Sequence, residues 1–156
     1  MNRWFTGSGE EVKFDEILKK IKQHTSDKGT VYVGTDSFLT KDKCTFSTAI
    51  VLHGAIGQSG GYYFFSKNHS KKPCYDVLVA RVTQEVTLSV QMGLKLKQLC
   101  PHTPVELHID ASASDKKTAT SKFSDMLIGF ARGAGFETKI KPYAFAAASI
   151  ADKHSK

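Results

Sequence analysis

The longest helical pattern in the chain is the feature that most restricts its fold. Residues 76–100 contain no proline and only one glycine, and apolar residues recur densely at helical period. Pro101 and Pro104 then end the pattern, because proline does not continue a helix. A helix of that extent is ~37 Å long at ~1.5 Å per residue. In a chain of 156 residues it would cross the whole domain, so we expect one domain built around it.

Shorter predicted strands and helices precede and follow this central helix in the sequence. Three of them precede it and predict an antiparallel meander: residues 31–37, 44–53 and 61–66. Four segments follow it and alternate between strand and helix: residues 105–111, 119–132, 136–141 and 143–154. Strands that alternate with helices require parallel pairing. The sequence therefore predicts an α/β fold with a five-stranded mixed sheet, in the order β-β-β-α-β-α-β-α.

The first 29 residues are predicted to form an N-terminal extension. Phe14, Ile17, Leu18 and Ile21 recur at helical spacing, and Gly29 follows them as a stop signal. We therefore expect residues 1–29 to be a helical extension packed on the outside. Residues 30–156 are expected to form a single globular unit.

The charge of the chain indicates which class of partner it binds, and its cysteine content indicates the cellular compartment. The 22 Lys and Arg against 15 Asp and Glu give a formal charge of +7, which attracts anionic partners such as nucleic acid. Cys44, Cys74 and Cys100 are odd in number and far apart, which favours three free thiols over disulfides or a zinc site. No stretch approaches the ~20 apolar residues of a membrane span, and the start lacks an apolar core of signal-peptide length. We expect a cytoplasmic protein without a membrane partner.

A carboxylate interrupts the apolar face of the central helix. One stripe, spaced alternately by four and three residues, contains Leu78, Val82, Glu85, Ser89, Met92, Leu96 and Leu99. An ionised Glu85 on such a face would be costly unless it were paired or bound to a metal. Two alternatives stay open: the face reaches solvent near Glu85, or Arg81 one turn earlier neutralises it.

Two aspartates stand at the carboxyl ends of predicted strands. In open α/β sheets ligands bind outside these ends, and Asp36 and Asp110 would converge there if their strands were parallel neighbours. Alternation puts Asp36 on the face of Gly34, and a glycine within a strand suggests close approach of another element, for which the central helix is the first candidate. A turn or capping role is the alternative for either aspartate alone.

A fourth carboxylate, Asp152, lies in the last predicted helix. Helical spacing puts it on the face of Phe145, Ala148 and Ser149. Its alternative role is that of a solvated residue near a fraying end. The order strand Asp, helix Glu, strand Asp, helix Asp favours a shared site.

These residues resemble the ribonuclease H-like superfamily, and more closely the bacterial YkuK-type family of small ribonuclease H-like proteins. The matching stretches are residues 34–37, 81–85, 108–110 and 141–153. The resemblance implies that Asp36, Glu85, Asp110 and Asp152 bind two Mg²⁺ or Mn²⁺ ions, with Asp36 bridging, and that the chain is a nuclease with a two-metal mechanism. The loop after Asp110 lacks the glycine expected in close relatives.

Further side chains are candidates for supporting roles. Ser37, His108 and His154 flank the acidic positions and are possible auxiliary groups, although packing is the alternative for each histidine. Substrate phosphate contacts are expected from Lys116, Lys117 and Lys153, with a solvated surface as the alternative. The aromatic run at residues 62–65 could stack a base on one face, with core packing favoured for most of it.

The predicted function is a metal-dependent nuclease acting on RNA, DNA or a hybrid. Two alternatives stay open. One is a catalytically silent ribonuclease H-like module that binds nucleic acid or a protein. The other is a dimeric resolvase-like enzyme that acts on structured DNA. The sequence does not predict the oligomeric state.

Overall fold

The computed structural model describes residues 2–58, 60–71, 77–110, 121–140 and 143–155. Three long strands form its centre: β3 (Thr30–Leu39), β4 (Lys43–His53) and β5 (Tyr62–Lys71). Because β4 pairs antiparallel with both of the others, the predicted meander is confirmed. β5 extends beyond the predicted end at Ser66, since the polar residues that follow still pair with β4.

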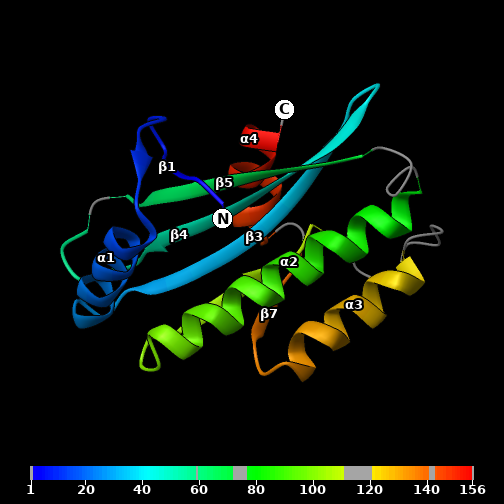
Figure 1. Ribbon diagram of the computed structural model, residues 1–156. Helices are drawn as coiled ribbons and strands as arrows, with labels where there is room; N and C mark the ends of the chain where they lie inside the picture. The colour runs from blue at the N-terminus through cyan, green and yellow to red at the C-terminus, as the bar shows by residue number, and fades with distance from the viewer. Residues whose placement is uncertain (1, 59, 72–76, 111–120, 141–142, 156) are drawn as a thin grey trace.

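Four shorter strands complete the sheet: β1 (Trp4–Thr6), β2 (Glu11–Val12), β6 (Val105–His108) and β7 (Glu137–Lys139). The strand order among the described residues is β2-β1-β5-β4-β3-β6-β7 (Figure 1). β6 is parallel to β3 and β7 is parallel to β6. The sheet is therefore mixed, as predicted.

The predicted count of five strands is wrong, because the described residues alone form a sheet of seven. The two additional strands, β1 and β2, lie within the residues predicted as a helical extension. β1 adds antiparallel to the outer edge of β5, and Trp4 on it is buried against the ring of Phe14, with centroids 5.8 Å apart. Strands of three and two residues among glycines and polar residues carry too little alternation to be read from sequence.

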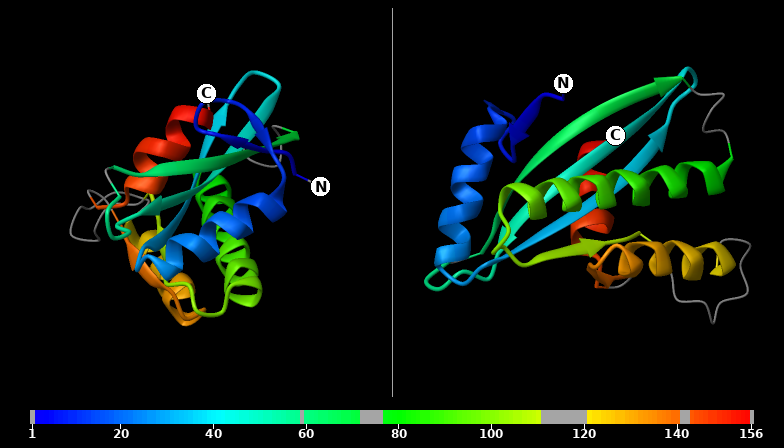
Figure 2. Two further views of the ribbon diagram at one scale, coloured as in Figure 1. Left: turned by 90° about the vertical axis from the view of Figure 1, so that its left-hand side faces the viewer. Right: turned by 60° about the horizontal axis from the view of Figure 1, so that its bottom comes forward.

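Helices cover the two faces of the sheet unequally. On one face lie α1 (Phe14–Ser26), α2 (Leu78–Leu99) and α3 (Ser121–Gly133), which together bury the larger core. Within the described ranges, the other face carries η2 (Ala146–Ala151) and α4 (Asp152–Ser155) alone, with a small core centred on Ala49 and Val51 (Figure 2). The chain end thus covers the sheet face opposite the central helix.

The last helix differs from the predicted one. Residues 143–154 were expected to form an α-helix, but η2 is a π-helix, in which hydrogen bonds join residues five apart. Ala146 and Ala151 are accordingly both buried on the sheet, whereas Ser149 is exposed. The predicted shared face of Ser149 and Asp152 is therefore wrong.

Two of the three cysteines lie in the described part of the chain. Cys44 and Cys100 are free and buried, and burial raises the pKa of each thiol, which lowers its reactivity. Cys74 lies outside the described residues. None of the helices in the described ranges is both long and apolar enough to span a membrane.

Candidate metal centre

Asp36 and Asp110 come together because their strands are parallel neighbours. Gly34 pairs with His108 at the end of the β3–β6 ladder, and two residues further along the same register brings Asp36 level with Asp110. β6 itself ends at His108, so Asp110 lies just beyond it. The condition under which the two aspartates converge, that their strands are parallel neighbours, is therefore met.

The end of the chain brings Asp152 to the same place. Ser155 on α4 donates a hydrogen bond from Oγ to Asp36 Oδ2 at 3.4 Å, and the Asp152 side chain is hydrogen-bonded to that of Asp36. Asp36 is 8% exposed. The α4 segment therefore covers the aspartate at the centre of the sheet.

Glu85 reaches the same level from the opposite face. Ser37, next to Asp36, donates a hydrogen bond from Oγ to Glu85 Oε2 at 2.7 Å. One turn further along α2, Ser89 Oγ lies 2.8 Å from Thr35 Oγ1. These two contacts fix the position of α2 along β3, so that Glu85 lies beside the end of the strand.

The element that approaches Gly34 is not the one expected from sequence. Gly34 lies on the same face of β3 as Tyr32 and Asp36. The side chains of Tyr32 and Asp36 contact Phe145 and Ser155, respectively. That face is covered by η2 and α4, whereas α2 contacts the alternate residues of β3. The element over the face of Gly34 is therefore the C-terminal segment.

Burial and mutual repulsion raise the pKa values of the central carboxyls. The pKa of Asp36 rises to about 7, first through burial, then through the hydrogen bond with Asp152 and the charges of Asp110 and Asp152. The pKa of Glu85 rises to about 8, chiefly through burial, and the charges of Asp36 and Asp110 add to the rise. Asp36 is thus linked electrostatically to all three other carboxylates.

The two alternative explanations for Glu85, exposure of its helix face to solvent and neutralisation by Arg81, can be compared with this geometry. The side chain is only 7% exposed, so the helix face does not reach solvent there. Arg81 lowers the pKa of Glu85, but its effect is the smallest of those acting, and the pKa stays raised. Neither solvent nor Arg81 compensates the buried carboxylate.

The donor set fits a hard divalent cation. Carboxylate oxygens are the preferred ligands of Mg²⁺, which usually keeps several waters and uses only one or two carboxylates. Within the described ranges no group of three or more His, Cys, Asp or Glu side chains converges into a ready-made metal cage. Water would therefore have to complete the shell of any cation that these carboxylates hold.

Ser47 is a polar group at this site that the sequence did not indicate. It pairs with Asp36 across β3 and β4 and so shares its face. Its hydroxyl is buried, and the described residues offer it no hydrogen-bond partner. A buried hydroxyl without a partner is costly, so a water or ion ligand beside Asp36 would satisfy it. The alternation of residues along β4 is the sequence signal that could have placed Ser47 on this face.

His108 supports the C-terminal segment. Its ring is 1% exposed, and Nδ1 accepts a hydrogen bond of 3.1 Å from the Ala146 backbone amide at the start of η2. Burial, followed by the charge of Lys139, lowers the pKa of His108 to about 4. Neutral His108 can donate from Nε2 to Glu106 at 3.3 Å. Its contacts position η2, which carries Asp152 at its end.

His154 is held by aromatic residues of β5. Its Nε2 lies 2.7 Å from the Tyr63 hydroxyl, and its ring stacks on Phe65 at 3.7 Å between centroids. Burial, then the charges of Lys153 and Lys67, lowers its pKa. Lys153 is exposed beside the site. The other predicted phosphate contacts, Lys116 and Lys117, lie outside the described residues.

Comparison with known proteins gives one match. A family model described as "Ribonuclease H-like" matches residues 12–156, which is most of the chain. The match supports the ribonuclease H-like resemblance of the sequence. No curated protein and no solved structure matches the chain.

Proposed function

Because the chain belongs to the ribonuclease H-like family, we propose that it is a metal-dependent nuclease that hydrolyses phosphodiester bonds of RNA or DNA. The observation that carries the proposal is the electrostatic link of Asp36 with Glu85, Asp110 and Asp152. Clustered acidic groups whose pKa values are raised by burial and mutual repulsion are typical of a functional site. A family fold alone would not indicate activity.

The roles of the residues follow from their places around β3. Asp36 would bridge two Mg²⁺ or Mn²⁺ ions, and Glu85, Asp110 and Asp152 would each complete one of the two ligand sets. When bound, such ions stabilise the attacking and leaving oxygens of an in-line displacement. Ser37 holds the Glu85 carboxylate through its hydroxyl, and Ser155 does the same for Asp36. These hydroxyls keep the carboxylates oriented before substrate binds.

Cations beside the carboxylates support an anionic substrate. Lys67 and Lys153 are both exposed, and both act on the pKa of His154 next to Asp152. Lys67 also lies in one cross-strand row with Ser47 and Asp36. Ammonium groups in these positions would contact phosphates that flank the scissile bond.

A second candidate function is a silent module that binds nucleic acid without cleaving it. The observation that favours it is that the described carboxylates do not form a ready-made cage of three ligands. Nucleic-acid binding needs the cations and not the carboxylates. The two candidates therefore differ in what a carboxylate substitution should do.

The test is a cleavage assay with purified protein in Mg²⁺ or Mn²⁺ and labelled RNA, DNA, hybrid and junction substrates. We expect cleavage of at least one substrate by the wild type and loss of it in Asp36→Asn. Asp125→Asn is the matched control, because Asp125 is exposed on α3. Absence of wild-type cleavage with retained binding favours the silent module. Cleavage of junctions alone by a dimer would favour the resolvase-like alternative.

A further inference from the structure

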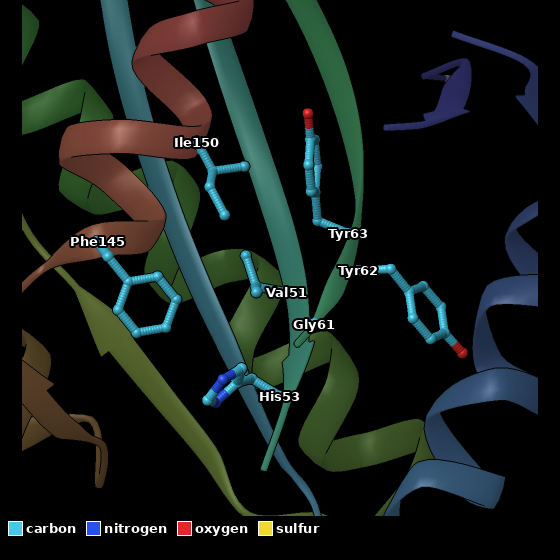
Figure 3. A pocket seen from close by; sticks show the side chains of 7 residues that line it. All are labelled: Val51, His53, Gly61, Tyr62, Tyr63, Phe145 and Ile150. Carbon is cyan, nitrogen blue, oxygen red and sulfur yellow. The ribbon is translucent and has the colours of Figure 1, made fainter. Parts of the chain in front are cut away.

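An apolar cavity lies on the sheet face that carries Asp36. Its volume is about 450 Å³, and Figure 3 shows Phe145, Tyr63 and His53 arranged around Val51 on the strand, with Ile150 above. Phe145 and Ile150 are five residues apart on and before η2, so the π-helical spacing turns both toward the cavity. The terminal segment therefore forms one wall and the sheet forms the floor.

Aromatic rings dominate this wall and rim. Phe145 lies 5.1 Å from Tyr32 and 6.3 Å from His53 between ring centroids. His53 is exposed, and its side chain stands at the mouth. A flat aromatic solute entering here would meet ring faces and edges, which is the environment that unpaired nucleobases occupy in single-strand binding proteins.

The cavity and Asp36 lie on one face of the sheet, at the two ends of the segment formed by η2 and α4. Val51 in the cavity floor pairs with Tyr32, which precedes Asp36 by four residues on the same face of β3. The separation is ~13 Å at ~3.3 Å per residue. That distance corresponds to about four nucleotides at the B-form rise of ~3.4 Å, and to fewer in an extended strand.

The side chains of β5 change from aromatic to basic between the level of the cavity and the level of Asp36. Residues on the face of Asp36 are Tyr63, Phe65, Lys67, His69 and Lys71, in that order. Tyr63 lines the cavity, Phe65 is covered by the ring of His154, and the exposed lysines lie at and beyond the level of Asp36. A strand with its base in the cavity would therefore reach the first of these lysines at the level of Asp36 and continue along them beyond it.

We propose that this cavity binds an unpaired nucleobase a few nucleotides from the carboxylates, so that the substrate is single-stranded on that side of the cleaved bond. The inference rests on the proposed function, since it assumes a nucleic-acid strand. A paired base cannot enter the cavity, because its Watson–Crick partner would have to enter with it. Fully double-stranded substrates are therefore expected to bind less tightly.

The experiment measures binding in EDTA, where cleavage plays no part. A short labelled single strand of RNA or DNA is compared with the blunt duplex of the same sequence by fluorescence anisotropy. Three variants are tested: His53→Ala, His53→Phe and, as the matched control, His102→Ala. His53 and His102 are both exposed, so these substitutions leave the core intact. A series of strands, each with one abasic site, locates the position of the bound base.

We expect His53→Ala to weaken single-strand binding by about fivefold or more, which is the lower limit of one base-stacking contact. His53→Phe should restore it, whereas His102→Ala should behave as the wild type. One abasic position should weaken binding to the wild type and have no effect on His53→Ala. Duplex binding should be the weaker in every protein.

Equal affinity for duplex and single strand, or no effect of His53→Ala, would overturn the inference about the cavity. The nuclease proposal would not be affected, because the cleavage assay tests it separately. Single-strand preference with the expected variant pattern, but without cleavage in Mg²⁺ or Mn²⁺, would support the base site and overturn the nuclease. No binding of any nucleic acid would overturn both.

Discussion

Ser37 and Glu85 are joined by a hydrogen bond of 2.7 Å that ties the central helix to the end of the central strand. The bond opposes the rise in the pKa of Glu85 that burial causes, because a hydroxyl donor stabilises the charged carboxylate. Ser37 thus keeps Glu85 closer to the ionised state in which it can bind a cation.

Replacing the serine hydroxyl should weaken metal-dependent activity. We expect Ser37→Ala to raise the Mg²⁺ concentration for half-maximal cleavage by about 10–100-fold, the usual effect of removing a group that orients a ligand. Ser37→Thr should retain most of the affinity, since it keeps the donor. Ser8→Ala, on the exposed N-terminal turn, is the control. An unchanged Mg²⁺ dependence in Ser37→Ala would show that Glu85 does not act through metal.

Stability of the metal-free protein should fall as pH rises through 7 and 8. The folded-state pKa values of Asp36, about 7, and Glu85, about 8, are raised, so the folded protein binds protons that the unfolded chain has lost, and stability decreases with pH. Thermal unfolding between about pH 6.5 and 9 measures this. Mg²⁺ should stabilise the protein most at the alkaline end, where both carboxyls are ionised. A flat profile, or a steeper one in Asp36→Asn, would contradict the prediction.

Removing one of the clustered charges should not harm the fold. In metal-free buffer, Asp110→Asn should leave the melting temperature unchanged or raise it, because Asp110 raises the pKa values of Asp36 and Glu85 by repulsion and functional sites often trade stability for charge clustering. The matched surface substitution Asp125→Asn should have little effect. A clear loss of stability in Asp110→Asn would instead indicate a capping role.

His108 should be needed for stability and for the placement of η2. His108→Ala leaves the buried Ala146 amide without its acceptor, which costs about 1–3 kcal/mol in addition to the cavity created. Its pKa of about 4 lies below the ordinary value, so its contribution to stability is complete above about pH 6.5 and is lost as the pH falls toward 4. Denaturant unfolding of wild type and variant measures both effects. Equal stability of the two proteins would refute the anchoring role.

The strand ends could be predicted from sequence because two independent signals agreed there. Alternation placed Asp36 and Asp110 at carboxyl ends, and the helix–strand alternation that follows required parallel pairing. The register from Val31 with Val105 to Gly34 with His108 has that geometry. Glu85 could be recognised for a similar reason, since one carboxylate stood out on an otherwise apolar stripe.

The C-terminal wall of the site could not be predicted in the same way. An alanine-rich segment gives no periodicity that separates α-helix from π-helix, so Ser149 was placed on the wrong face. The short strand containing Trp4 gave no alternation either, and it was hidden in a polar segment. Which face of β3 each helix would cover, and hence what approaches Gly34, depends on long-range packing and not on local pattern.

The π-helix has a consequence for how this chain can change by insertion or deletion. Loss of one residue from the run Ala146–Ala151 would allow ordinary α-helical hydrogen bonding. Because a π-helical turn holds about one residue more than an α-helical turn, such a loss would leave Asp152 on nearly the same side of the helix. A single-codon deletion could thus keep the fourth carboxylate in place although the alanine run became shorter. Among homologues, an alanine run shorter by one residue would then be compatible with a retained fourth carboxylate.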